Sequence, residues 1–126
     1  MGIIENDIEV KDAENVNLEV VKPYNDEQID AHAAKIGGRR FLKEIYVDTD
    51  DGYRYIYLVK RPSRSVIDAV AEKGKKEDVN GITKLMFGCI LEGDMKALDN
   101  DASIYQVLIQ KISELSRNAK AELKKI

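Results

Sequence analysis

Residues 39–62, with the sequence RRFLKEIYVDTDDGYRYIYLVKRP, decide the fold that we expect for this chain of 126 residues. Two runs in which apolar and polar residues alternate flank the dipeptide Asp51-Gly52. Alternation with a period of two is typical of a half-buried strand, and Asp-Gly favours a type I′ turn between antiparallel strands. The stretch therefore predicts a β-hairpin over residues 40–60.

A two-residue turn at Asp51-Gly52 would place Val47 opposite Ile56 and Tyr46 opposite Tyr57. One face of the hairpin would then be aliphatic, made of Phe41, Ile45, Val47, Ile56 and Leu58. The other face would carry Tyr46, Tyr53, Tyr55 and Tyr57, beside Leu42 and Val59. We expect the aliphatic face to point to the core. We predict that Tyr46, Tyr55 and Tyr57 contact a partner, because phenol rings combine apolar surface with a polar tip.

Helix signals lie on both sides of the hairpin. Asn25 or Asp26 can cap a helix over residues 26–36, and Gly37-Gly38 stops it. Beyond the hairpin the pattern predicts three more helices, over residues 64–73, 77–92 and 102–125. We therefore predict the α+β class, with an N-terminal β-hairpin, or a small antiparallel sheet, followed by a helical C-terminal part.

The domain organisation follows from the charge pattern. Residues 1–22 are acidic and predict a partly flexible N-terminal arm with a short strand over residues 16–21. Residues 23–126 are predicted to form one domain, since a chain of this length buries a single modest core.

The last predicted helix carries a long apolar stripe. Leu108, Ile112, Leu115, Ala119 and Ile126 follow one another at helical spacing, with Leu123 beside them and Tyr105 and Ile109 widening the stripe. Such a stripe usually faces a core, but a helix this long can extend beyond its own core. We predict partner contacts at Tyr105, Ile109, Ile112 and Leu115.

Composition excludes several classes of function. Lys and Arg number 20 against 23 Asp and Glu, a net charge of −3, which argues against binding nucleic acid. One cysteine and one histidine cannot form a Cys/His zinc site, and we expect neither a metal nor a cofactor. The sequence shows no constellation of acid, base and nucleophile that is typical of catalysis, so we do not expect an enzyme. No apolar run reaches the roughly 18 residues that would span a membrane, and a cytoplasmic protein is expected.

Three bases, Lys60, Arg61 and Arg64, surround Pro62. Proline ends a strand, and Ser63 can cap the helix that follows. We interpret these bases as an exposed joint between a strand and a helix, with contact to an acidic partner as the lesser alternative.

Three stretches together resemble a known family: FLKEIYVDTDDGYRYIYLVKRPSRSVIDAV, MFGCILEGDMKALDND and the ending ELKKI. They resemble the small tail assembly chaperones of long-tailed phages and prophages, of the lambda type, over roughly residues 28–126. The resemblance implies a short-form chaperone in the bacterial cytoplasm. Such a protein binds the tape measure protein, keeps its apolar helices soluble and helps to recruit the tail tube protein. A frameshift-extended form occurs in many members.

Two alternatives stay open at this point. One is a structural tail component of a phage or mobile element, such as a terminator or connector subunit. The other is a DNA-binding regulator, although the second helix of its apparent helix-turn-helix pattern carries Lys84 as its only base. We also allow for a homo-oligomer.

Overall fold

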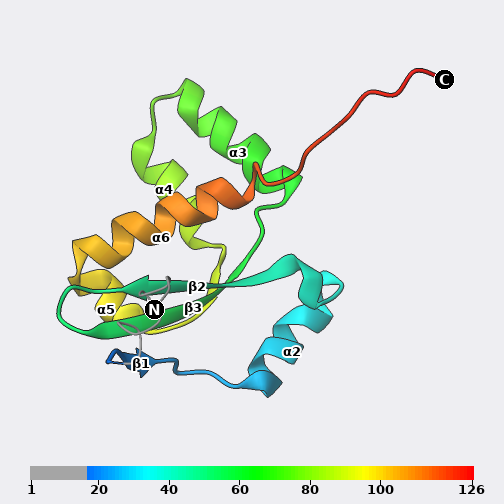
Figure 1. The fold of residues 1–126 in the computed structure, drawn as a ribbon. Helices are drawn as coiled ribbons and strands as arrows, with labels where there is room; N and C mark the ends of the chain where they lie inside the picture. The colour runs from blue at the N-terminus through cyan, green and yellow to red at the C-terminus, as the bar shows by residue number, and fades with distance from the viewer. Residues whose placement is uncertain (1–16) are drawn as a thin grey trace, which may run out of the picture.

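A computed structural model describes residues 17–126 and shows a mixed α/β fold built on a small sheet (Figure 1). In the described part of the chain the sheet has four strands: β1 (Glu19–Val21), β2 (Leu42–Asp48), β3 (Tyr53–Lys60) and β4 (Ile90–Glu92). Strand β3 lies at the centre. It pairs with antiparallel β2 along one edge, and with parallel β1 and antiparallel β4 along the other.

Helices both precede and follow the hairpin, so the order of elements differs from a hairpin followed only by helices. Helix α2 (Asp26–Ile36) precedes the hairpin, and a short 3-10 turn, Arg39–Phe41, leads into β2. The helices α3 (Arg64–Lys75), α4 (Val79–Phe87), α5 (Met95–Asn100) and α6 (Ala102–Leu115) follow β3. Four helices therefore occupy the region where we predicted three, and strand β4 interrupts them.

Local capping explains where α2 lies. The side chain of Asn25 accepts a hydrogen bond from the Gln28 amide, and the Gln28 side chain accepts one from the Asn25 amide. This reciprocal pair satisfies two amides that have no partner within the helix. Gly37 then ends the helix with φ of 95°, a left-handed conformation that glycine adopts without steric cost. The helix thus spans the predicted residues 26–36.

The hairpin forms over nearly the predicted residues, but its predicted register is wrong by one position. The loop holds three residues, Asp50, Asp51 and Gly52, between the hydrogen-bonded Thr49 and Tyr53. A three-residue loop of this type closes with glycine in the left-handed region, as Gly52 does with φ of 94°. Ile45 therefore pairs with Tyr57, and Val47 pairs with Tyr55.

This register places Tyr55 and Tyr57 on the face of Ile45 and Val47, because cross-strand partners share a face. Tyr46 lies on the opposite face, where it pairs with Ile56. The face beneath α6 carries Ile45, Val47, Tyr55, Tyr57 and Val59, which pack with residues of α4, α5 and α6 in the larger core. The face beneath α2 carries Leu42, Ile56 and Leu58, which pack with Tyr24, Ile29 and Ala33 in the smaller core. The predicted split into an aliphatic core face and a tyrosine face is thereby corrected.

The predicted helix over residues 77–92 ends early. Helix α4 stops at Phe87, and Ile90–Glu92 instead form β4 along the part of β3 that β1 leaves unpaired. Pairing with β3 satisfies backbone groups that a buried segment cannot leave without partners. Asp94 then caps α5 by accepting a hydrogen bond from the Ala97 amide. The sequence pattern did not predict this helix.

The last helix also ends early, at Leu115 and not near residue 125. Residues 118–126 form no helix or strand, and every residue from Ser116 to Ile126 is exposed. Helix propensity alone does not hold a short terminal segment in a helix without packing.

Two predictions concern the N-terminal arm. Strand β1 occupies the second half of the short strand predicted over residues 16–21. The predicted flexibility of the arm falls mainly on residues 1–16, which lie outside the described residues.

Candidate partner-binding site

Half-buried apolar side chains occur on three helices, α3, α4 and α6. We call this set the helical seam: Val66 and Val70 of α3, Ile82 and Phe87 of α4, and Tyr105, Ile109 and Leu115 of α6. All of them pack against the larger core and none is fully buried. The seam is thus apolar surface that the fold covers only in part.

Helix α3 contributes to the seam in an unusual way, because it contains no buried residue along its 12 positions. Its start is well defined, since the hydroxyl of Ser63 accepts a hydrogen bond from the Val66 amide. Ile67, on the same helix, remains 38% exposed. Helices of small domains normally gain stability by burying an apolar face, and α3 leaves much of its own face uncovered.

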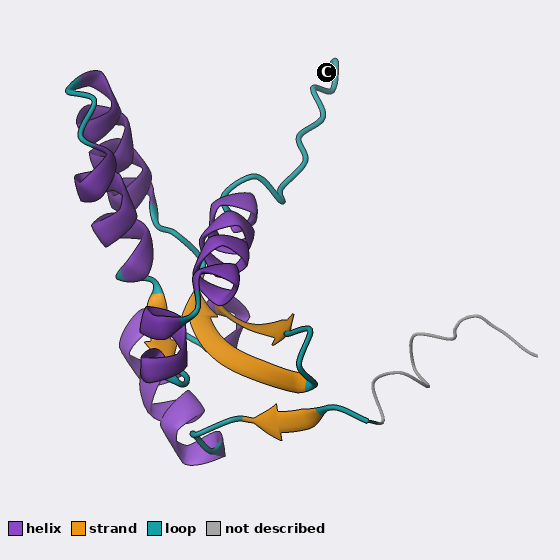
Figure 2. Ribbon diagram, turned by 90° about the vertical axis from the view of Figure 1, so that its left-hand side faces the viewer, coloured by secondary structure: helices purple, strands orange, loops and turns teal. Residues whose placement is uncertain are grey.

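The α3–α4 pair extends beyond the sheet on the side of α6 (Figure 2). Val79, at the start of α4, is 70% exposed and adds apolar surface to this projection. Where α4 meets α6, the ring centroids of Phe87 and Tyr105 lie 5.3 Å apart. These two rings border a cavity of about 380 Å³, which Leu98 and Ala102 also line.

Of the predicted contact residues on α6, three lie in the seam and one does not. Tyr105, Ile109 and Leu115 are half-buried, so each offers a partner some apolar surface. Ile112 has no exposed surface and belongs to the core, so in this conformation it cannot touch a partner. Its position at the centre of the stripe explains this, because the centre of an apolar stripe faces the core most directly.

The three predicted tyrosine contacts are not brought together. Tyr46 is 54% exposed, and the guanidinium of Arg54 lies 5.0 Å from its ring centroid. Tyr55 is half-buried on the opposite face, and Tyr57 has no exposed surface. The hydroxyl of Tyr57 donates to the Asp94 carbonyl at 2.7 Å, which gives this buried phenol its partner. Of these three tyrosines, Tyr46 alone has a largely exposed side chain.

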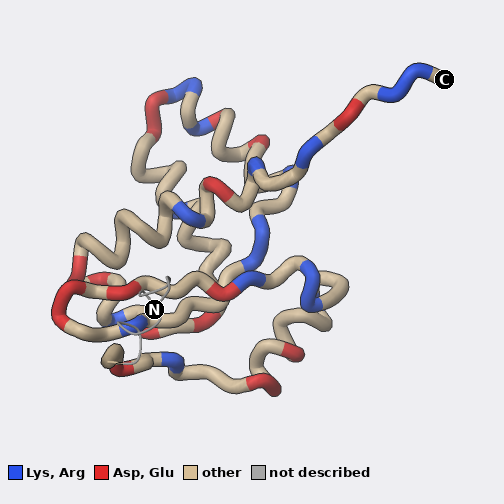
Figure 3. Tube along the Cα trace, viewed as in Figure 1, with Lys and Arg blue, Asp and Glu red and all other residues tan. Residues whose placement is uncertain are grey.

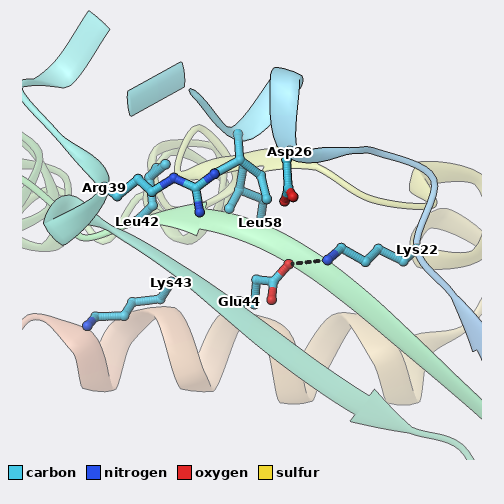
Figure 4. Close-up of a pocket in the computed structure, with 8 residues that line it drawn as sticks. Lys22, Asp26, Arg39, Leu42, Lys43, Glu44 and Leu58 are labelled. Atoms are coloured by element: carbon cyan, nitrogen blue, oxygen red, sulfur yellow. Dashed lines mark ion pairs between the residues drawn. The ribbon is translucent and has the colours of Figure 1, made fainter. Parts of the chain in front are cut away.

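A cavity of about 330 Å³ lies between α2 and the adjoining strands, with Ile29, Leu42 and Leu58 in its wall (Figure 4). Figure 4 shows the Lys22 ammonium turned toward the Glu44 carboxylate, and these groups lie 3.1 Å apart. The wall also includes the charged residues Asp26, Arg39 and Lys43. Because both signs of charge share this wall, the cavity does not select for an anion or for a cation.

Glu44 also contacts the segment that precedes α2. It accepts a hydrogen bond from the Tyr24 hydroxyl at 2.6 Å. Desolvation opposes ionisation of Glu44, but the hydrogen bonds from Tyr24 and Lys22 prevail and lower the pKa of the carboxyl group. Burial, reinforced by the bond to Glu44, raises the pKa of the Tyr24 phenol. These contacts join the segment before α2 to β2, which is a structural task.

Two residues that catalysis often uses are tied into the fold. Nε2 of His32 lies 2.8 Å from Glu92 and links α2 to β4, a contact that no sequence spacing suggested. Cys89 is fully buried, and this burial raises the pKa of its thiol, which disfavours the reactive thiolate. Among the described residues, no three His, Cys, Asp or Glu side chains are grouped to hold a metal ion. No described helix is long and apolar enough to cross a membrane.

The basic joint around Pro62 has a partly structural role. Arg61 donates from Nη1 to the Leu115 carbonyl at 3.1 Å and so satisfies a free carbonyl at the end of α6. Arg64 is almost fully exposed and makes only a long ion pair with Asp68, at 3.6 Å. The joint is thereby placed beside the end of α6, where further bases follow along the chain (Figure 3).

No protein-family model matches the chain, and comparisons with curated proteins and with solved structures find no match. The chain's own residues, and the surfaces that the fold leaves open, are therefore the basis for inferring its function.

Proposed function

We propose that this protein is a tail assembly chaperone of a phage or prophage, which binds apolar helices of the tape measure protein and keeps them soluble. The observation that carries the proposal is the helical seam, together with α3, a 12-residue amphipathic helix in which no residue is fully buried. A protein that holds client helices needs apolar surface of this kind and no chemical step.

The binding mode is the docking of an amphipathic helix against apolar helices. Ile67, Val79 and the rings of Phe87 and Tyr105 provide side chains that a client helix can cover. Burying a fully exposed large aliphatic side chain contributes about 1.5–3 kcal/mol, and a half-buried one contributes less, so binding needs several of these contacts together. Recruitment of the tail tube protein belongs to the same proposal.

Co-expression with the tape measure protein of the same genome tests this function. The soluble fraction of the tape measure protein should rise when this chain is present. Ile67→Ser should reduce that gain, whereas Val20→Ser, on the distant strand β1, should preserve it. Val20 is a matched control because it is 57% exposed, so that neither substitution opens the core. Equal solubility of the tape measure protein with and without this chain would refute the proposal.

A second measurement separates a chaperone from a structural tail component. An assembly chaperone leaves the particle, so mass spectrometry of purified tails should find tail tube and tape measure peptides but none from this chain. Peptides from this chain at the abundance of a tail subunit would favour the structural component.

A further inference from the structure

Residues 116–126 have the sequence of an amphipathic helix but no helical structure. Leu123 is fully exposed, and so is Ile126. If α6 continued through this segment, Leu115, Ala119 and Leu123 would follow one another at intervals of four residues. They would extend the same stripe that Ile104, Leu108 and Ile112 bury in the core.

The segment lacks a surface to pack on, not the propensity to form a helix. Ala, Glu, Leu and Lys make up residues 119–125, and all four are strong helix formers. Most helical stability in proteins comes from packing of an amphipathic face, and Leu123 and Ile126 have no such packing. A partner that covers Leu123 and Ile126 would supply what is missing.

The end of α6 also lies beside apolar surface that is already open. Leu115 and Val66 pack against the same core, and Arg61, just before α3, contacts the Leu115 carbonyl. The start of α3 therefore lies next to the point where residues 116–126 leave the body of the protein. Ile67, on this helix, is still 38% exposed.

The charge of this region identifies the chemistry of its partner. Residues 60–68 and 114–126 contain seven bases and three acids, a net charge of +4 in a chain whose total is −3. On a continued helix, Lys120 and Lys125 would flank the apolar stripe on its two sides. Flanking positions of this kind set the choice of partner in paired helices through their charges.

We propose that residues 116–126 become a helical continuation of α6 when they bind an acidic amphipathic helix, which packs against both this continuation and α3. The inference rests on the proposed function and names the chemistry of the client segment. The segment itself supplies Leu123 and Ile126 to the apolar contact and Lys120 and Lys125 to the acidic flanks of the partner helix.

Two synthetic peptides test the proposal on the full chain. Each is about four heptads long with Leu at a and d; one carries Glu at every e and g position, and the other carries Lys. Like charges at e and g oppose pairing of each peptide with itself, which leaves it free to bind. We expect the Glu peptide to bind at least about tenfold more tightly than the Lys peptide. We also expect the backbone chemical shifts of residues 118–126 to become helical on binding.

Two pairs of variants identify the contacts. Leu123→Ser with Ile126→Ser should weaken binding of the Glu peptide by roughly tenfold or more, while Met95→Ser, at an exposed apolar site on α5, should not. Lys120→Glu with Lys125→Glu, which brings the net charge of residues 60–68 and 114–126 to zero, should abolish the preference for the Glu peptide. Lys35→Glu with Lys96→Glu, an equal change of charge at exposed positions elsewhere, should leave the preference unchanged.

Several results would overturn the proposal. Equal affinity for both peptides, or binding that leaves residues 118–126 non-helical, would remove its basis. So would helical shifts that appear as the chain is concentrated without peptide, because the occupant would then be a second copy. Helical shifts that depend on residues 1–16 would assign the segment to the chain's own acidic arm. A preference for vesicles of phosphatidylserine and phosphatidylcholine over the Glu peptide would make the occupant a lipid surface.

The two proposals fail in distinguishable ways. If the variant with Leu123→Ser and Ile126→Ser keeps the tape measure protein as soluble as the unaltered chain does, the chaperone function stands and this inference fails. If the unaltered chain binds the Glu peptide but does not affect the tape measure protein, the inference stands with a different client.

Discussion

Helix α6 and the segment that follows it carry one continuous apolar pattern, yet the structure treats its two halves differently. Ile104, Leu108 and Ile112 have no exposed surface, whereas Leu123 and Ile126 are fully exposed. The difference is the neighbour, because the sheet covers the first half and nothing in the described chain covers the second. Periodicity therefore shows which face of a helix is apolar, but not whether another part of the protein covers that face.

We expect the largest loss of stability when one of two leucines of the same apolar pattern, the buried Leu108, is truncated, and almost no loss at the exposed Leu123. Leu108→Ala should lower the free energy of unfolding by about 2–5 kcal/mol, because it removes buried methyl groups and leaves a cavity. Leu123→Ala should change it by less than about 0.5 kcal/mol, since this side chain is already in water. Urea denaturation of both variants measures the contrast, and a similar loss in both would show that the segment packs on the body without a client.

A substitution at Gly93, which follows β4, should cause a smaller loss of stability in the same core. Gly93 has φ of 143°, and a Cβ atom placed there would overlap the ring of the buried Tyr57. Gly93→Ala should therefore destabilise the fold by about 2–3 kcal/mol, through strain and displacement of the ring. Gly38→Ala is the matched control. Gly38 has a similar φ of 135° but open space around an added Cβ atom, so this substitution should cost only about 1 kcal/mol in thermal or urea unfolding. Equal costs would mean that this part of the core accommodates larger side chains.

Arg61 contacts the boundary between α6 and residues 116–126, at the Leu115 carbonyl. Arg61→Ala removes the hydrogen bond to the Leu115 carbonyl and should cost about 1 kcal/mol, the usual contribution of one such bond. Arg64→Ala, a few residues away and almost fully exposed, should have no measurable effect on stability. Urea denaturation measures both. If the two variants behave alike, Arg61 does not stabilise the end of α6.

The smallest effect concerns the start of α6 and depends on pH. Hydrogen bonds from Ser103 to the carboxylate of Asp101 lower the pKa of this capping group below its usual value. A lowered folded-state pKa means that the contribution to stability is present above the unfolded-state pKa and is lost as the pH falls through the folded-state value. Asn caps helices as well as Asp does but does not titrate, so Asp101→Asn should lose less stability on acidification than the unaltered chain. Urea denaturation at neutral pH and at about pH 2.5 measures the difference, and equal losses would contradict the role of this cap.

Local signals in the sequence predicted several elements well. Capping residues and stop signals identified α2 and the start of α3 at Ser63. The helical pattern identified the start of α6 at residue 102. Alternation around residues 42–60 identified the hairpin that forms the centre of the sheet. These features depend on neighbours in the sequence, which explains why they can be read from it.

The errors arose where distant segments decide the structure. Asp51-Gly52 fits a two-residue turn, but the chain uses a three-residue loop, and this one position moved Tyr57 into the core. Ile90–Glu92 continues an apolar helical pattern, yet pairing with β3 makes it a strand. The contact between His32 and Glu92 joins residues 60 positions apart and has no local signal.

For the candidate site, the pattern identified the half-buried Tyr105, Ile109 and Leu115, but it could not separate them from the fully buried Ile112. Exposure depends on what packs above a residue, and the sequence does not state that. The exposed part of α3 was likewise not predicted, because its apolar pattern is that of an ordinary core helix.

Amide hydrogen exchange, measured with and without bound client, tests most directly the claim that the second half of the stripe serves a partner. We expect amides of α6 up to Leu115 to be protected in both states, and residues 118–126 to exchange freely in the unbound chain and to become protected on binding. Free exchange of residues 118–126 in a complex that demonstrably holds its client would show that this segment does not bind the client.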